Sequence, residues 1–267
     1  MNLKSLLTIT GITTCLALPC LAEVFEFTTE ELAPFNFLDK SDGKLKGIAI
    51  DLLHDIMKDQ GFTYQKDYVI KMMPWARAYD QALQKPNTCA FATYATEKRL
   101  PLFQWVGPLL TAKWSFYAKK GSGIKLSSLP ELANVIKTHK ENKSPFIIGG
   151  YGSDAPTGFV KDYLKDSLKM DDNEVKRIVD EAPDNNNNIL KLSDGKIQLW
   201  ATGDPAGAYM AKMAGKSDQI ENIFTFQEIP MSISCNKGFS SELIAKMQKT
   251  LDRLEKSGDA DKYRRAH

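Results

Sequence analysis

Hydrophobic and polar positions follow two different periods along the chain, and stretches of the two kinds alternate. Residues 24–28 alternate apolar and polar side chains, as a half-buried strand does. By contrast, Ile48, Leu52 and Ile56 recur at helical spacing. In this first part we expect strands over 24–28, 64–72 and 88–94 and helices over 48–57 and 75–84. Such alternation predicts a mostly parallel sheet that is covered by helices.

Two long, extended, aromatic-rich stretches, 103–119 and 224–235, enclose a second region of the same kind. Between them we expect a helix opening over 126–132, helices over 156–168 and 205–214, and strands over 146–150, 175–179 and 197–201. One strongly periodic helix over 240–256 follows. The pattern predicts an α/β protein of two lobes joined by two crossing strands. Lobe 1 comprises 23–108 and 236–267, and lobe 2 comprises 109–235 with the crossing segments.

The N-terminus has the layout of a secretory signal peptide. Lys4 precedes an apolar stretch over residues 5–18, and the small residue Ala22 marks a cleavage site. A membrane anchor is the alternative, but the stretch is shorter than the roughly 20 residues that a bilayer requires. Pro19 argues against a lipid anchor at Cys20. We therefore expect residues 1–22 to be removed and the rest to be a soluble periplasmic protein.

Charge and cysteine content narrow the classes of partner and site. The 35 basic and 33 acidic residues are mixed along the chain, so nothing indicates binding to nucleic acid or to a membrane surface. After cleavage Cys89 and Cys235 remain, and either a disulfide or two buried free thiols fits their apolar surroundings. The three histidines lack the spacing of metal ligands. No metal site and no cofactor are indicated.

Several motifs in a fixed order resemble one known family. They are the segment 33–37 after the first strand, the segment 42–51 before a helix, Pro74-Trp75, Thr96-Glu97-Lys98-Arg99, and Gly203-Asp204-Pro205-Ala206. This order is similar to that of the extracytoplasmic solute-binding proteins associated with polar amino acid ABC importers. The resemblance covers essentially the whole mature chain. It implies a type II periplasmic-binding-protein fold.

Arg99 and Asp204 are the charged residues that this resemblance places at the ligand. It implies that Arg99 holds a ligand carboxylate and that Asp204 holds an amino group. The planar guanidinium suits a carboxylate because it donates two parallel hydrogen bonds. A solvated loop arginine is the alternative for Arg99. A helix N-cap before Pro205 is the alternative for Asp204.

Aromatic and small residues complete the expected binding site. The resemblance makes Trp75 an aromatic wall with Phe35 on the same side, although core packing is the competing account for both. Gly152 and Ser153 follow a strand and precede a helix, where backbone N–H groups bind anions. Thr96 opens the motif that ends at Arg99. The four asparagines 185–188 fit a polar loop or helix cap and receive no ligand role.

Two positions depart from the pattern of amino-acid binders. Tyr94 stands where such proteins have small hydroxyl residues, and Leu32 stands where many have an aromatic residue. Tyr94 either shrinks the pocket, replaces a serine hydroxyl by a phenol, or stacks on a planar ligand. The ligand is therefore an amino-acid-like zwitterion or a carboxylate, and its identity stays open.

Three classes of function are compatible with this site. We expect a monomeric, non-enzymatic binding protein that closes its lobes around the ligand and delivers it to a membrane importer. A sensor that presents its ligand-bound form to a membrane receptor would need the same cleft. A dehydratase-like enzyme would need a further acid or histidine at the ligand, and the sequence contains no recognisable catalytic motif.

Overall fold

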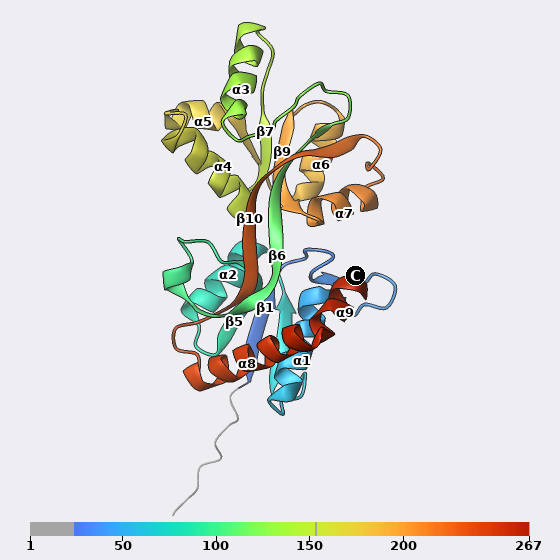
Figure 1. Ribbon diagram of the computed structural model, residues 1–267, viewed down its shortest axis with the longest axis vertical. Helices are drawn as coiled ribbons and strands as arrows, with labels where there is room; N and C mark the ends of the chain where they lie inside the picture. The colour runs from blue at the N-terminus through green and yellow to red at the C-terminus, as the bar shows by residue number, and fades with distance from the viewer. Residues whose placement is uncertain (1–23, 153, 267) are drawn as a thin grey trace, which may run out of the picture.

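The computed structural model describes residues 24–152 and 154–266, which form two α/β lobes joined by two long strands (Figure 1). These strands are β6 (Gln104–Lys119) and β10 (Ile220–Cys235), which pair with each other in antiparallel fashion along their length. They unite both lobes in one sheet of order β4-β1-β5-β10-β6-β9-β7-β8. The two-lobed fold that the sequence predicted is confirmed.

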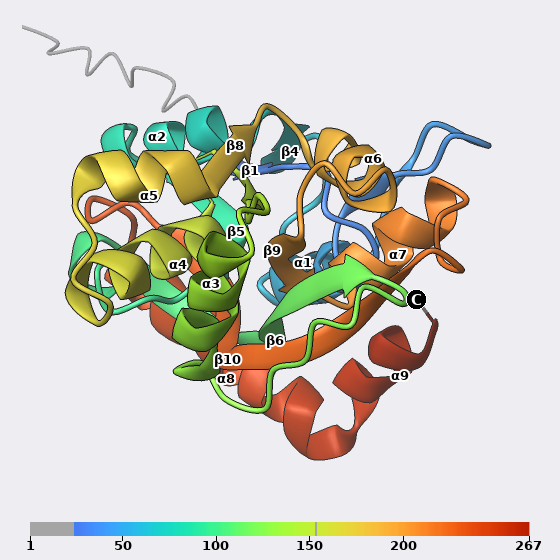
Figure 2. The same cartoon turned by 90° about the horizontal axis from the view of Figure 1, so that it is seen from above.

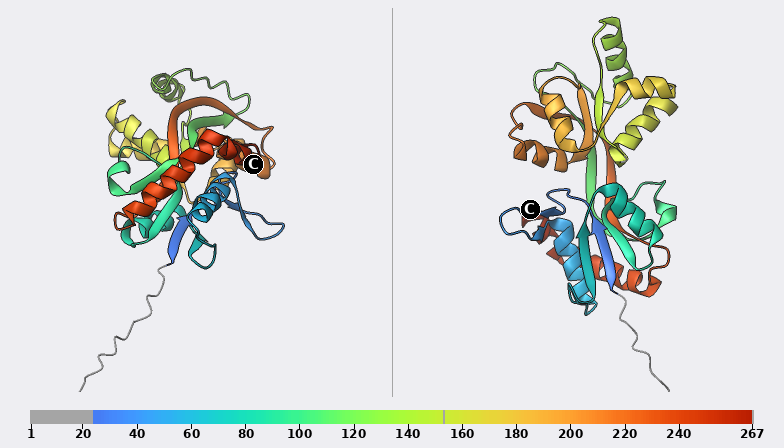
Figure 3. Two further views of the ribbon diagram at one scale, coloured as in Figure 1. Left: turned by 60° about the horizontal axis from the view of Figure 1, so that its bottom comes forward. Right: turned by 180° about the vertical axis from the view of Figure 1, so that it is seen from behind.

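The first lobe contains the parallel strands β4, β1 and β5, which lie at one end of the sheet. β1 pairs in parallel with β4 and β5, and β5 pairs in antiparallel fashion with β10. Helices α8 and α9 run beside α1 along one face of this lobe (Figure 3). The elements of this lobe are β1 (Phe25–Thr29), β2 (Phe37–Leu38), β3 (Leu45–Lys46), α1 (Ile48–Asp59), β4 (Tyr68–Met72), α2 (Trp75–Gln84), β5 (Thr88–Tyr94), α8 (Ser241–Ser257) and α9 (Asp259–Ala266).

The second lobe continues the sheet with β9, β7 and β8. Helices α3, α4 and α5 lie on one side of its strands, and α6 and α7 lie on the other (Figure 2). Leu164 of α4 and Leu192 of α6 are fully buried in the two resulting core clusters. The elements are α3 (Glu131–Glu141), β7 (Ile148–Tyr151), α4 (Ala155–Asp166), α5 (Asp172–Ile178), β8 (Val179–Ala182), α6 (Asn185–Ser193), β9 (Leu199–Asp204) and α7 (Ala206–Met213).

One local expectation in the second lobe is wrong. The segment 175–179 is mostly helical, because a capping box between Asp171 and Glu174 starts α5 and only Val179 begins a strand. The helix expected to open over 126–132 begins at Glu131. Of the two alternatives for the asparagine tract, a loop or a helix cap, the structure has the helix end: the tract forms the first turn of α6, which Asp184 caps.

Cys89 and Cys235 form a disulfide, which decides between the two alternatives that the sequence left open. They face each other in the register of β5 and β10, and both side chains are fully buried. The bond therefore links the end of β10, where the chain comes back from the second lobe, to β5 in the core of the first lobe.

Some expectations fall on residues that the structure does not describe. The predicted signal peptide, residues 1–22, and the predicted ligand residue Ser153 lie outside the described residues. Within the described ranges, no helix has the length and apolar character required to cross a membrane. Those ranges also contain no group of three or more side chains suited to hold a metal ion.

Candidate functional site

A cleft of about 880 Å³ lies between the two lobes. Its lining comes from α2, from the turn after β5, from the first half of α4 and from the crossing strands β6 and β10. The volume is near the upper end of the range of roughly 300–1,000 Å³ that small-ligand pockets occupy. The carboxyl end of β5 faces the cleft. Open α/β sheets bind ligands at the carboxyl ends of their strands. This cleft is the candidate site.

The turn after β5 carries Thr96 and Arg99 into this cleft, as the sequence predicted for both. The backbone N–H of Arg99 donates to the carbonyl oxygen of Thr96 at 2.8 Å, and the 3₁₀ turn Leu100–Leu102 follows. Trp75, the first residue of α2, also lines the cleft and is 5% exposed. The structure thus brings together three of the predicted residues.

The guanidinium of Arg99 lies over two neighbouring aromatic rings of α2. Its central carbon is 5.2 Å from the centre of the Trp75 ring and 5.1 Å from that of Tyr79, within cation–π range. Its side chain donates to the Tyr94 carbonyl oxygen over a long 3.4 Å and has no ion pair with any described residue. Burial lowers the pKa of Arg99. A half-buried cation with so few acceptors is ready to bind an anion.

Two carboxyl groups act electrostatically on the same arginine. Glu30 directly follows β1, and Asp154 caps the N-terminus of α4 by accepting from the Thr157 N–H at 2.8 Å. Burial, reinforced by Asp154 and opposed by Arg99, raises the pKa of Glu30 to about 8. Burial raises the pKa of Asp154 to about 7, although the hydrogen bonds from Thr157 and the charge of Arg99 lower it. Both groups therefore change charge near neutral pH.

Tyr94, the last residue of β5, lies between the lobes next to the cleft. Its ring meets the ring of Trp114 edge-on, with centroids 5.3 Å apart. Its hydroxyl approaches Gly203 of β9 so closely that a Cβ on Gly203 would be 2.4 Å from the phenol oxygen. Burial raises the pKa of the Tyr94 phenol. Tyr94 is thus neutral and fills space between β5 and β9.

Trp114 of β6 contributes a buried aromatic side chain to the cleft. It lines the cleft and is 2% exposed, and its indole N–H acts as a hydrogen-bond donor on the Tyr94 phenol. Its ring also meets the ring of Phe159 of α4, at 5.9 Å between centroids. Trp114 therefore gives the cleft an aromatic wall.

Three further predicted ligand residues, Asp204, Phe35 and Gly152, do not line this cleft. Asp204 accepts from the Tyr117 hydroxyl at 2.5 Å and from the Asn222 amide at 3.2 Å. Phe35 is 3% exposed and packs in the core of the first lobe. Gly152 is half-buried at the end of β7.

Glu30, Asp154, Tyr79 and Trp114 were not predicted as ligand residues, although local signals existed for the two acids. Glu30 follows a strand that ends at the cleft, and Asp154 precedes Ala155-Pro156, an arrangement typical of a helix N-cap. Tyr79 lies one helical turn after Trp75, a spacing that by itself indicates a residue of the hydrophobic core. The proximity of Glu30 to Arg99 depends on the pairing of β1 with β5, and that of Asp154 depends on how the two lobes pack.

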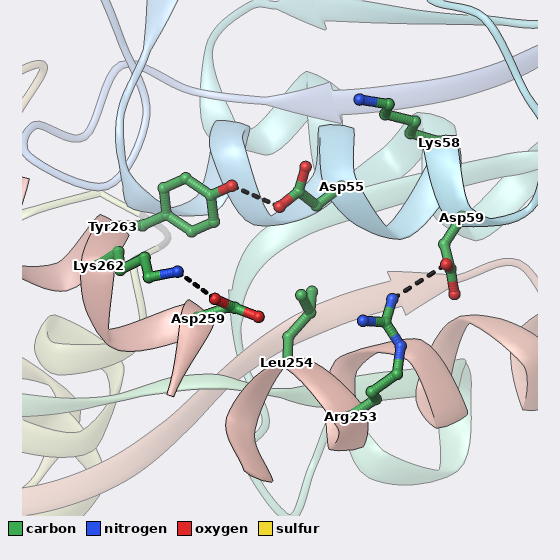
Figure 4. A pocket seen from close by; sticks show the side chains of 8 residues that line it. All are labelled: Asp55, Lys58, Asp59, Arg253, Leu254, Asp259, Lys262 and Tyr263. Carbon is green, nitrogen blue, oxygen red and sulfur yellow. Dashed lines mark hydrogen bonds and ion pairs between the residues drawn. The ribbon is translucent and has the colours of Figure 1, made fainter. Parts of the chain in front are cut away.

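A second cavity, of about 420 Å³, lies on the first lobe between α1, α8 and α9 (Figure 4). Its charged side chains pair with one another: Tyr263 donates to Asp55, Lys262 contacts Asp259, and Arg253 contacts Asp59. The contact between Tyr263 and Asp55 joins the last helix to the first, and that between Arg253 and Asp59 joins α8 to α1. The acids here have partners in the protein, unlike the cation in the cleft between the lobes.

The fold is similar to three solved structures with a TM-score of 0.70. An ancestral arginine-binding protein bound to arginine is 22% identical, over 90% of this chain and 96% of that chain. The arginine-, lysine-, histidine-binding protein ArtJ from Geobacillus stearothermophilus is 18% identical, over 91% and 94%. A histidine kinase sensor domain with similarity to periplasmic binding proteins is 14% identical, over 91% and 95%. At these identities the likeness establishes the fold.

The family comparison extends over almost the whole described chain. No curated protein matches the sequence. The model of the bacterial extracellular solute-binding proteins, family 3, matches residues 27–267. That range includes both lobes, both crossing strands and the whole lining of the cleft. The chain therefore belongs to family 3 of the bacterial extracellular solute-binding proteins.

Proposed function

We propose that this protein captures a small amino-acid-like zwitterion or carboxylate in the cleft between its lobes and delivers it to an ABC importer. The observation that carries the proposal is the half-buried Arg99 guanidinium, which lies over the Trp75 and Tyr79 rings and has no ion pair with any described residue. A charge taken out of water needs compensation. A ligand carboxylate supplies it with two parallel hydrogen bonds.

Contacts across the cleft support capture by lobe closure. Lys98 of the first lobe forms an ion pair with Asp162 of α4 at the cleft. Phe37 lies near Tyr209 of α7, with ring centroids 6.2 Å apart. A ligand that contacts both lobes favours this closed arrangement over an open one, because it binds the closed form more tightly. The structurally similar proteins that bind arginine support an amino-acid-like ligand.

The proposal also covers the location, oligomeric state and class of the protein. It acts as a monomer in the periplasm after removal of residues 1–22, and it is not an enzyme. The extracellular character of the family supports this location. A sensor role is the second candidate, since a histidine kinase sensor domain has the same fold. Loss of solute uptake on deletion of the gene would favour the importer role over the sensor role.

The test is ligand binding by Arg99 variants. A thermal-shift screen of the periplasmic protein against amino acids and small carboxylates identifies ligands, since a ligand at 100 times its dissociation constant adds about 2.7 kcal/mol of stability. We expect Arg99→Gln to lose binding of every carboxylate by at least 100-fold in calorimetry. Arg99→Lys, which keeps the charge without the planar fork, should retain only weak binding. Unchanged affinity in Arg99→Gln, with an unchanged circular dichroism spectrum, would remove the proposed role.

A further inference from the structure

The place where an amino-acid binder would hold an ammonium group is already occupied by the protein itself. Asp204, the expected acceptor, has one carboxylate oxygen bound to the Tyr117 hydroxyl and the other to the Asn222 amide. An ammonium ion brings three donors that need acceptors when it leaves water. At Asp204 an ammonium ion would therefore share each carboxylate oxygen with a protein donor.

Tyr94 closes the path between Asp204 and the cleft. Its hydroxyl lies against Gly203, the residue before Asp204, with no space there even for a methyl group. Its ring is fixed edge-on to Trp114. A ligand held by Arg99 therefore cannot place a substituent between β5 and β9 without displacing the phenol.

The cation of the cleft is an unused hydrogen-bond donor. The Arg99 guanidinium lines the cleft and has N–H groups without described acceptors. Unsatisfied buried donors are rare in proteins, so each points to an acceptor that arrives with the ligand. The walls around them are the aromatic rings of Trp75, Tyr79 and Phe159. An anionic oxygen group on an apolar body matches both features.

We propose that the ligand is a carboxylate with an aromatic or other apolar body and without an α-ammonium group, and that Tyr94 is the residue that excludes the ammonium. This inference rests on the proposed function, because it takes Arg99 as the carboxylate site. The preference separates this protein from binders of free amino acids.

The test compares amino acids with their deaminated analogues by calorimetry at pH 7. The pairs are L-phenylalanine with 3-phenylpropanoate, L-arginine with 5-guanidinopentanoate, and L-glutamate with glutarate. We expect the phenyl pair to bind, and in every pair that binds we expect the analogue to bind at least tenfold more tightly. A tighter amino acid in any pair, or binding by no analogue, would overturn the inference. An ammonium held by Glu30 or Asp154 would give the first of these results.

Tyr94 variants test the cause of the preference. Tyr94→Ser removes the ring and should shift the ratio of the two affinities at least tenfold toward the amino acid. Tyr94→Phe removes only the hydroxyl oxygen that lies against Gly203 and should shift the ratio in the same direction but by less. An unchanged circular dichroism spectrum of both variants is the folding control. An unchanged ratio in Tyr94→Ser would contradict the role of Tyr94. If amino acids bind more tightly but still depend on Arg99, this inference fails and the proposed function stands. If all binding survives Arg99→Gln, the proposed function itself fails.

Discussion

Two carboxyl groups with raised pKa values make the cleft sensitive to pH. The pKa of Glu30 is about 8 and that of Asp154 is about 7, so both lose their protons between pH 6 and pH 9. The groups that act on them electrostatically, besides each other, are Arg99, Tyr94, Tyr151 and Glu181. Burial is the largest cause of both shifts. The protonated acids donate hydrogen bonds, whereas the ionised acids repel an anion.

We predict that carboxylate affinity falls as pH rises from 6 to 9. A bound anion raises the pKa of neighbouring acids further, so binding takes up protons, and by linkage the dissociation constant increases where those protons are lost. Calorimetry across this range should show at least a tenfold increase. The double variant Glu30→Gln with Asp154→Asn, whose amides stay neutral, should flatten the profile. An affinity that rises with pH would indicate that these acids bind a cationic group instead.

The residues of the cleft differ in how far the sequence alone could predict them. Thr96 and Arg99 lie on one short turn after a strand, so their shared position follows from local sequence. Glu30 and Asp154 belong to different lobes and each lies more than 50 residues from Arg99 in the chain, so their effect on Arg99 depends on how distant elements pack. Asp204 was predicted as a ligand residue from its motif. Its partner Tyr117, on the neighbouring strand β6, could not be found from that motif.

The elements show a similar division between local and distant causes. The bounds of α2 and β5 match the prediction, because Pro74 starts the helix and an apolar run of seven residues forms the strand. The segment 175–179 was misjudged, since its apolar positions Val175, Ile178 and Val179 fit a strand and a helix equally well. The capping box of Asp171 and Glu174 decides for the helix. It was visible in the sequence and outweighs β-propensity.

The disulfide between β5 and β10 makes a prediction about the stability of these elements. Replacing both Cys89 and Cys235 by alanine frees a loop with a sequence separation of 146 residues. We expect the free energy of unfolding to fall by about 2–5 kcal/mol. Urea unfolding followed by circular dichroism measures this. Ligand affinity should change less than twofold, because the bond lies in the lobe core, away from the cleft lining. An unchanged urea midpoint would show that the bond contributes nothing.

At the scale of the whole molecule, one continuous sheet connects the lobes, so closure must bend the two crossing strands. β10 shifts register against β6 at three places, including between Thr225 and Gln227. Bulges of this kind bend and twist strands locally. The lobes meet where Tyr94 of the first approaches Gly203 of the second. The lobes can approach this closely here because Gly203 has no side chain.

We predict that Gly203→Ala hinders closure and that Tyr94→Phe restores it. The added Cβ would lie 2.4 Å from the Tyr94 hydroxyl oxygen but 3.6 Å from the ring carbon that bears it, which is an ordinary contact. Removing that oxygen therefore removes the clash. Because Trp114 packs against the Tyr94 ring, the ring has little freedom to turn away.

Small-angle X-ray scattering with and without 3-phenylpropanoate measures closure, and calorimetry measures its effect on affinity. In Gly203→Ala we expect no decrease in the radius of gyration on ligand addition and an affinity at least fivefold weaker. The double variant should contract and bind like Tyr94→Phe alone, since its phenyl ring leaves room for the methyl group. Closure of Gly203→Ala to the same radius as the unmodified protein would show that the lobes do not meet through Tyr94. Failure of the double variant to recover would place the damage in β9 itself, where Gly203 pairs with Trp114.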